Sequence, residues 1–129
     1  MDRNTLLAKA REAMAKAVAP SSKFRVGAAL LCDDGSVFTG CNIESPTYLG
    51  ICAERVALFK ALSEGQRRFR EIAIVCGTNG ACSPCGACRQ ILWEFAGDLE
   101  IILANLRRET GRFRLGELLP VPFDGRLLK

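Results

Sequence analysis

The chain contains no histidine among its 129 residues. Histidine is the commonest metal ligand and the usual acid–base group near neutral pH, so a catalytic or metal site here must use sulfur or carboxylate groups. No segment reaches the roughly 18 apolar residues of a membrane span. The N-terminus also lacks the apolar run of a signal peptide. These absences predict a cytoplasmic protein with no membrane partner.

Strong charge of one sign is also absent. The formal net charge is +4, and charged residues make up 25% of the chain. The densest basic clusters, at residues 67–70 and 107–114, are typical of solvated faces, so we expect no nucleic-acid partner. A hydrophobic fraction of 49% supports a sizeable core, and the length predicts a single domain over residues 1–129. So short a chain has little room for a deep pocket, which favours completion of a site by a partner subunit.

Hydrophobic periodicity predicts alternating helices and strands. We expect helices over residues 4–18, 52–63 and 85–95, strands over 25–31, 36–40, 72–76, 99–103 and 112–115, and a helical turn over 116–119. This order predicts a mixed sheet with helices on both faces. Two cysteine-bearing segments stand where a helix begins, which is where ligand sites collect in such sheets.

Seven cysteines without a secretory signal predict reduced thiols, not a disulfide framework. Cys32, Cys41, Cys76 and Cys82 are interpreted as small buried or loop residues. The remaining cysteines are Cys52, Cys85 and Cys88. Cys85 and Cys88 have the spacing that lets two thiolates bind one ion at a helix start, with Cys52 supplied by another helix start.

Three thiolates leave one position of a tetrahedral zinc ion open, as in catalytic zinc sites. Their summed charge exceeds that of zinc by one negative unit, so we expect two helix N-termini and the nearby Arg55 to offset it. Gln90 is expected to orient Arg55. The alternatives are an inert thiol pair, half of a structural zinc knuckle, or part of an iron–sulfur run that includes Cys82.

Glu54 follows Cys52 by two residues. At this distance its carboxylate can move protons at the open zinc position without being a ligand. A glutamate in the first turn of a helix also has a common structural role, because it complements the helix dipole. Its combination with the three cysteines favours the catalytic interpretation.

The motifs Cys-Ala-Glu-Arg at 52–55 and Pro-Cys-Gly-Ala-Cys-Arg-Gln at 84–90 resemble the zinc-dependent cytidine deaminases of the short, homotetrameric type. The resemblance covers nearly the whole chain, including residues 22–29, 40–44, 57–65 and 117–123. It implies a three-layer α/β/α fold with a mixed five-stranded sheet. It also implies one zinc ion per chain on Cys52, Cys85 and Cys88, with Glu54 as the proton shuttle.

The resemblance further implies a nucleoside-binding site. Asn42 and Glu44 match positions that bind the ribose hydroxyls, and Phe24 matches a base-stacking aromatic residue. Ala53 would offer backbone contacts to the pyrimidine edge, and Tyr48 is expected beside the base. Phe123 matches an aromatic residue that reaches the base from a neighbouring subunit.

This chain departs from the family pattern between Glu44 and Cys52, where it is one residue shorter than usual. The segment leads into the zinc-bearing helix, so the adjustment should fall on the loop that contains Tyr48. We expect a gap near the leaving amino group that admits N4-substituted cytidines. The alternative is that the loop closes again without functional effect.

The predicted activity is therefore hydrolytic deamination of cytidine and deoxycytidine to uridine and deoxyuridine, in pyrimidine salvage. One alternative is a deaminase that acts on cytosine in nucleic acid; the compact chain and the pair Asn42 and Glu44 fit a free sugar better. A second alternative is a noncatalytic zinc or iron–sulfur module, which Glu54 and the open zinc position argue against.

Overall fold

The computed structural model describes residues 1–80 and 82–128. Five strands form one sheet: β1 (Val26–Cys32), β2 (Val37–Cys41), β3 (Phe69–Cys76), β4 (Glu100–Ala104) and β5 (Glu109–Arg114). Their order is β2-β1-β3-β4-β5. Only β3 and β4 run parallel, whereas the other neighbours are antiparallel. The predicted mixed five-stranded sheet is therefore confirmed.

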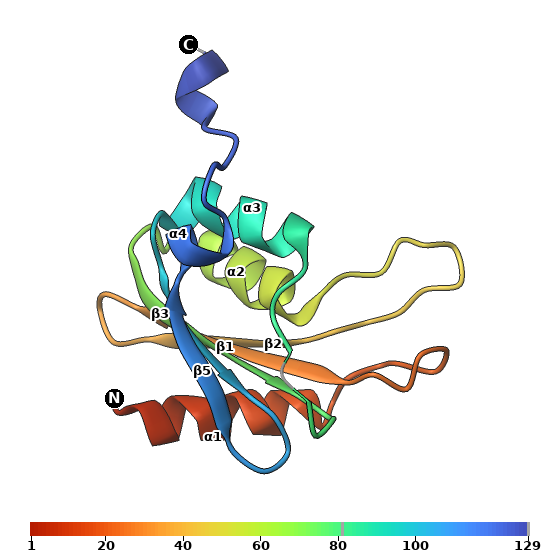
Figure 1. Cartoon of the computed structure of the whole chain (residues 1–129). Coiled ribbons are helices and arrows are strands. Elements are labelled where there is room, and N and C mark those ends of the chain that lie inside the picture. Colours follow the sequence, from red (N-terminus) through yellow and green to blue (C-terminus); the bar gives the residue numbers. More distant parts are fainter. Residues whose placement is uncertain (81, 129) are drawn as a thin grey trace.

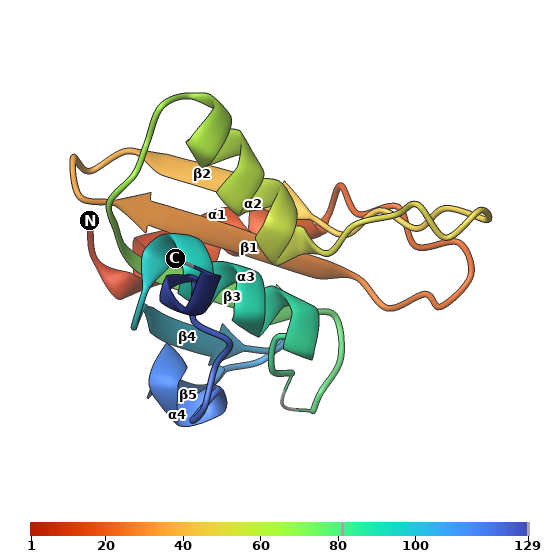
Figure 2. The same cartoon turned by 90° about the horizontal axis from the view of Figure 1, so that it is seen from above.

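Helices cover both faces of this sheet. They are α1 (Arg3–Met14), α2 (Ala53–Ser63), α3 (Gly86–Ala96), the short α4 (Leu115–Leu118) and the 3-10 helix η1 (Gly125–Leu128). Figure 1 shows α1 beneath the sheet and α2 with α3 above it. Figure 2, seen from above, shows α2 and α3 side by side across the strands. The three-layer α/β/α arrangement is confirmed.

Strand alternation explains the two cores. Along β1, Ala28 and Leu30 belong to the core beneath α2 and α3, whereas Ala29 and Leu31 belong to the core against α1. Successive side chains of a strand point to opposite faces, and both faces here are covered. The central strands therefore read as almost continuous apolar runs. The hydrophobic effect acting on both faces holds the layers together.

Glycine lets α2 lie close to the edge of the sheet. A Cβ atom at Gly40 of β2 would meet the Ala53 carbonyl oxygen and the Ala57 amide nitrogen. Any larger residue would therefore push away the first turns of α2. Cys52, a candidate metal ligand, immediately precedes this helix. Gly40 therefore sets how close Cys52 lies to the sheet.

The structure departs from the predicted elements in several places, including β3, which begins at Phe69, three residues before the predicted start. The helix predicted over 4–18 ends at Met14, and Val18 instead pairs with the loop after β2, where its amide donates to Asn42 O at 3.0 Å. β5 begins at Glu109, three residues early, because its register with β4 starts there. The sequence analysis did not predict η1. Hydrophobic periodicity indicates which residues of one segment are buried. It does not show which segments pair through backbone hydrogen bonds when they lie far apart in the chain.

The prediction of reduced thiols throughout is wrong for one pair. Cys76 and Cys82 form a disulfide, with a Cα–Cα distance of 6.2 Å. Cys76 ends β3, and the following loop returns Cys82 to it, a closure that spacing alone does not reveal. Cys32, Cys41, Cys52, Cys85 and Cys88 are free thiols.

Two loops extend from the same side of the molecule (Figures 1 and 2). One joins α1 to β1 and the other joins β2 to α2. The Glu44 amide donates to Val18 O at 2.8 Å, which ties the loops together near their bases. Across residues 1–80 and 82–128, no helix combines the length and the apolar character needed to cross a membrane.

Candidate metal centre and active site

Three cysteine sulfurs converge where α2 and α3 begin. Cys52 is the N-cap of α2 and Cys85 is the N-cap of α3, and Cys88 lies in the first turn of α3. The Cys52 and Cys85 sulfurs are 3.8 Å apart, and those of Cys85 and Cys88 are 3.4 Å apart. Zinc–sulfur bonds of about 2.3 Å in a tetrahedron place sulfurs about 3.8 Å apart, so the three thiols fit one zinc ion.

Among the residues that the structure describes, this is the only group of three potential ligands whose donor atoms lie together. Cys82 does not join it, because its sulfur is bonded to Cys76. The iron–sulfur interpretation, which needed Cys82 beside Cys85 and Cys88, is therefore not supported by the geometry.

Positive charge surrounds these sulfurs, as the charge count requires. The two N-caps place the sulfurs at the positive ends of two helix dipoles. Arg55 Nη2 donates to Cys52 Sγ at 3.3 Å. Hydrogen bonding with Cys88 and with Arg55 lowers the pKa of Cys52 to about 5. The hydrogen bond with Cys52 raises the pKa of Cys88 well above its usual range.

Glu54 is buried beside the sulfur group. Its side chain is only 4% exposed. Burial disfavours the charged carboxylate and raises the pKa of Glu54 to about 7. A carboxyl group that titrates near neutral pH can both accept and release a proton under working conditions. Its position thus suits the proton-shuttle role expected for it.

A cavity of about 170 Å³ joins the metal ligands to residues expected to bind substrate. Its lining residues are Phe24, Val26, Asn42, Cys52, Ala53, Glu54, Ile74, Cys82, Ser83 and Cys85. The structure therefore brings two of the three predicted zinc ligands, the proton shuttle, the base-stacking residue and the ribose-binding amide into one space. Cys82 and Ser83 also line this space, although the sequence analysis assigned them no role.

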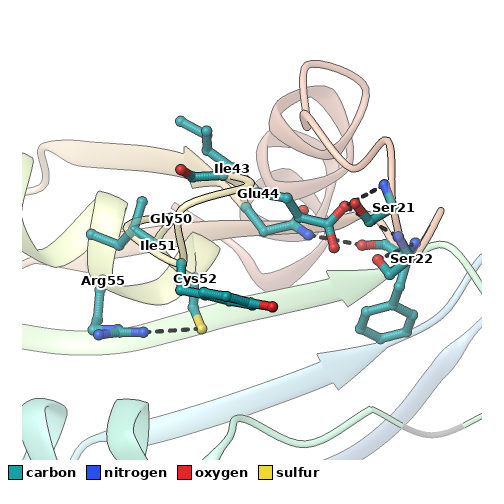
Figure 3. A pocket seen from close by; sticks show the side chains of 12 residues that line it. Ser21, Ser22, Ile43, Glu44, Gly50, Ile51, Cys52 and Arg55 are labelled. Carbon is teal, nitrogen blue, oxygen red and sulfur yellow. Dashed lines mark hydrogen bonds between the residues drawn. The ribbon is translucent and has the colours of Figure 1, made fainter.

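An open cleft of about 450 Å³ lies next to this cavity and shares Phe24, Asn42 and Cys52 with it. Glu44, Tyr48 and Arg55 are among its other lining residues. Figure 3 shows the Glu44 carboxylate beside Ser21 and Ser22 at one end, and Arg55 bonded to Cys52 at the other.

Backbone amides hold the Glu44 carboxylate. Its Oε1 accepts hydrogen bonds from Ser21 N at 3.0 Å and Ser22 N at 3.2 Å. Hydrogen bonding with Ser22 holds the pKa of Glu44 below its usual range, so the group stays ionised. The second oxygen, Oε2, makes no such bond to either serine and can accept a hydroxyl. Neither serine was assigned a role from the sequence, because a side-chain pattern does not report bonds from backbone amides.

Asn42 fixes the backbone that carries Phe24. Its Nδ2 donates to Phe24 O at 2.8 Å, and its Oδ1 accepts from Val26 N at 2.8 Å. These bonds set the orientation of the amide and leave it one further N–H and one further lone pair. Asn42 can therefore serve as both donor and acceptor toward a sugar.

Tyr48 stands at the tip of a closed loop. Ile43 and Ile51 exchange backbone hydrogen bonds of 3.0 and 2.9 Å across its base. Tyr48 has a positive φ of 61° and is 96% exposed. Tyr48 lines the cleft, but it does not line the smaller cavity that contains Glu54, which we call the inner cavity. The segment between Glu44 and Cys52 thus forms an exposed loop, while Cys52 lies beside Cys85 at the metal centre.

Gln90 does not orient Arg55, and that prediction is wrong. Gln90 Nε2 donates to Phe123 O at 2.8 Å, and Phe123 N donates to Gln90 Oε1 at 3.1 Å. Arg55 Nε is buried with no hydrogen-bond partner in the described part of the chain. Gln90 was expected in the neighbourhood of Arg55, but its amide contacts the C-terminal segment. Phe123 lines neither cavity of its own chain.

The sequence analysis also missed Arg89, which anchors the segment before α3. Its guanidinium donates to Pro84 O at 2.8 Å, Ser83 Oγ at 2.9 Å and Leu118 O at 2.6 Å. These bonds fix the backbone that immediately precedes Cys85 and connect it to α4. Arg89 therefore supports the metal centre without touching it.

Known proteins share this sequence and fold. The family model described as "Cytidine and deoxycytidylate deaminase zinc-binding region" matches residues 1–104. A cytidine deaminase from Sporosarcina psychrophila is 46% identical over 126 residues, which cover 96% of this chain and 93% of that relative. A cytidine deaminase from Halalkalibacterium halodurans is 48% identical over 125 residues, 95% of each chain.

A crystal structure of cytidine deaminase from Burkholderia pseudomallei superposes with a TM-score of 0.91 at 46% identity, covering 95% of this chain and all of that one. That of the Mycobacterium tuberculosis cytidine deaminase gives a TM-score of 0.82 at 43% identity, covering 95% and 98%. The agreement extends over sequence, fold and the three-cysteine centre, and the chain therefore belongs to the zinc-dependent cytidine deaminase family of enzymes.

Proposed function

We propose that residues 1–129 form one domain that hydrolyses cytidine and deoxycytidine to uridine and deoxyuridine, with release of ammonia, as a cytoplasmic step of pyrimidine salvage. The observation that carries this proposal is the inner cavity. It unites a buried, near-neutral Glu54 with Cys52 and Cys85, two of the three convergent thiols, and with the side chains of Phe24 and Asn42.

Zinc held by Cys52, Cys85 and Cys88 would supply a Lewis acid that lowers the pKa of a water molecule. The remaining work belongs to side chains of the protein. Glu54 accepts a proton as water adds to C4 of the cytosine ring and delivers it to N3. Glu54 then assists departure of the amino group as ammonia. Burial of Glu54 keeps this proton within the site.

The rest of the cavity is suited to hold a nucleoside. Phe24 offers an apolar face for the pyrimidine, and Ala53 offers backbone polar groups at the start of α2. Asn42 and the ionised Glu44 offer a donor and acceptors for sugar hydroxyls. A cleft that is open above this cavity admits a free nucleoside without requiring a channel for flanking nucleotides.

We further propose that the active form is a homotetramer in which Phe123 completes the site of a neighbouring subunit. Phe123 is 49% exposed and lies outside its own cavity. Other large apolar side chains are exposed as well, among them Phe24, Ile43, Tyr48, Leu49, Phe59, Phe95 and Val121. These exposed apolar side chains are available for contacts with other subunits.

The test is a substrate panel on purified protein, followed by ultraviolet absorbance together with elemental analysis. Cytidine and deoxycytidine should be converted, whereas free cytosine and a cytosine-containing oligonucleotide should not. Turnover of the oligonucleotide alone would favour the nucleic-acid deaminase. Full zinc content without turnover of any member would favour the noncatalytic module.

A further inference from the structure

The C-terminal segment, residues 120–128, leaves the body of the protein after α4 and extends away from it (Figure 1). Its side chains are poorly covered, since Val121 is 90% exposed and Leu128 is 78% exposed. Arg126 pairs locally with Asp124. A segment with so few buried contacts has little intrinsic order. Something outside the segment must therefore hold Phe123 if its ring is to reach a defined point on another subunit.

Gln90 provides that hold. Its amide forms two hydrogen bonds with the backbone of Phe123, one from Nε2 to the carbonyl at 2.8 Å and one to Oε1 from the amide at 3.1 Å. Within residues 1–80 and 82–128, these are the only hydrogen bonds that join residues 120–128 to the rest of the chain. A paired donor and acceptor fixes both the position and the direction of the backbone.

The orientation of the Gln90 amide is itself set. Nε2 also donates to Glu94 Oε1 at 3.1 Å, one turn further along α3. Both hydrogens of the amide nitrogen are thus used, and Oε1 is left to face the Phe123 amide. A glutamate at position 90 would keep the length of the side chain. It would place a second carboxylate beside Glu94 and could not donate to the Phe123 carbonyl.

α3 carries Gln90. The N-terminal end of the same helix carries Cys85 as its N-cap and Cys88 in its first turn. Gln90 therefore attaches the C-terminal segment to the same helix that carries two zinc ligands. We propose that Gln90 is a positioning residue that aims Phe123 into the nucleoside site of the neighbouring subunit. This inference rests on the proposed function, in which Phe123 is shared between subunits.

The first readout is independent of activity. Trp93, the one tryptophan of the chain, lines a cavity with Glu94, Asp124, Gly125 and Arg126. It therefore reports whether the segment stays against α3. Gln90→Ala and Gln90→Glu should make the emission of Trp93 shift to the red and quench more readily with acrylamide. Gln66→Ala is the control, because Gln66 is also half-buried and its amide bonds Asp34 at the hairpin turn.

The second readout is catalytic. Both Gln90 variants should keep one zinc per chain and lose kcat/KM by roughly tenfold, about the value of one base–aromatic stacking contact. The loss should appear mainly in KM. Phe123→Ala should show a similar loss, and the double variant should lose no more than the single ones. Gln90→Glu separates the loss of hydrogen bonding from any loss of packing.

Mixed oligomers then decide which subunit Gln90 serves. Coexpressed Gln90→Ala and Glu54→Gln chains should regain activity, because the zinc site of the first chain receives Phe123 from the second. Gln90→Ala mixed with Phe123→Ala should not recover, since neither chain presents a well-placed ring. If Gln90 acted on the zinc site of its own chain, the two mixtures would give the opposite results.

Wild-type protein without cytidine turnover would refute the proposed function. Active wild type with a fully active Phe123→Ala variant would refute the sharing of Phe123. Active wild type, impaired Phe123→Ala and unaffected Gln90 variants, or the opposite mixing pattern, would overturn the role of Gln90 alone.

Discussion

The metal centre and the outer part of the nucleoside site differ in how completely one chain builds them. At the centre, Glu54 is 4% exposed and the cysteines stand at two helix starts packed on the sheet. In the outer region, Tyr48 is 96% exposed on a loop and Phe123 is 49% exposed on the C-terminal segment. This difference agrees with our proposal that one chain holds all of the chemistry and that a second chain completes substrate recognition.

The largest expected effect comes from breaking the inner region. Cys85→Ala removes one of three thiolates, so we expect loss of zinc and of nearly all activity. Elemental analysis and the ultraviolet assay measure both. Cys32→Ala, which removes a buried thiol outside the metal centre, should keep its zinc. Full zinc retention in Cys85→Ala would show that the ligand assignment is wrong.

Replacing the proton shuttle should leave the metal centre intact. Glu54→Gln fills the same space but cannot exchange protons, so kcat should fall by about 10²–10⁴ while zinc content and nucleoside binding persist. Isothermal titration and steady-state kinetics separate the two properties. Glu64→Gln, at the opposite end of α2, should be fully active. A near-normal kcat for Glu54→Gln would assign the proton transfer to another group.

A moderate loss of nucleoside binding is expected when Glu44, a sugar-binding residue of the same chain, is changed. Glu44→Gln keeps the shape of the side chain but removes its charge, which weakens hydrogen bonds to sugar hydroxyls. Hydrogen bonds to charged groups contribute about 1.5–3 kcal/mol, so KM should rise by roughly tenfold or more. Zinc content and kcat should stay close to those of the wild type. An unchanged KM for cytidine and deoxycytidine would remove Glu44 from the sugar site.

The smallest effect concerns the shortened loop. Inserting glycine after Tyr48 restores the usual length, and a gap near the leaving amino group should then close. The ratio of kcat/KM for N4-substituted cytidines to that for cytidine should fall, by a few-fold, relative to the wild type. An unchanged ratio would indicate that the loop, already closed by the Ile43 and Ile51 pairing, does not set this selectivity.

The inner region was also the part that the sequence predicted well. The helices beginning after Cys52 and at Cys85 start within one residue of the prediction, because their N-caps and apolar periodicity are local features. The zinc ligands and Glu54 followed from residue type and spacing. Packing on the sheet then places them as the spacing suggested.

The outer region was predicted less well, because its contacts join residues far apart in the chain. Gln90 was expected in the neighbourhood of Arg55, yet its amide binds Phe123, 33 positions further along the chain. The capping of Glu44 by Ser21 and Ser22 uses backbone amides, which no side-chain pattern reports.

The most direct test of this division of labour is complementation between two inactive or impaired chains. Phe123→Ala and Glu54→Gln chains are coexpressed with different tags, and oligomers that contain both are purified and assayed. If sites are shared, zinc centres on Phe123→Ala chains receive intact rings from their partners, and about a quarter of the wild-type site activity should return under random assortment. Activity no higher than that of the Phe123→Ala chains alone would contradict the account.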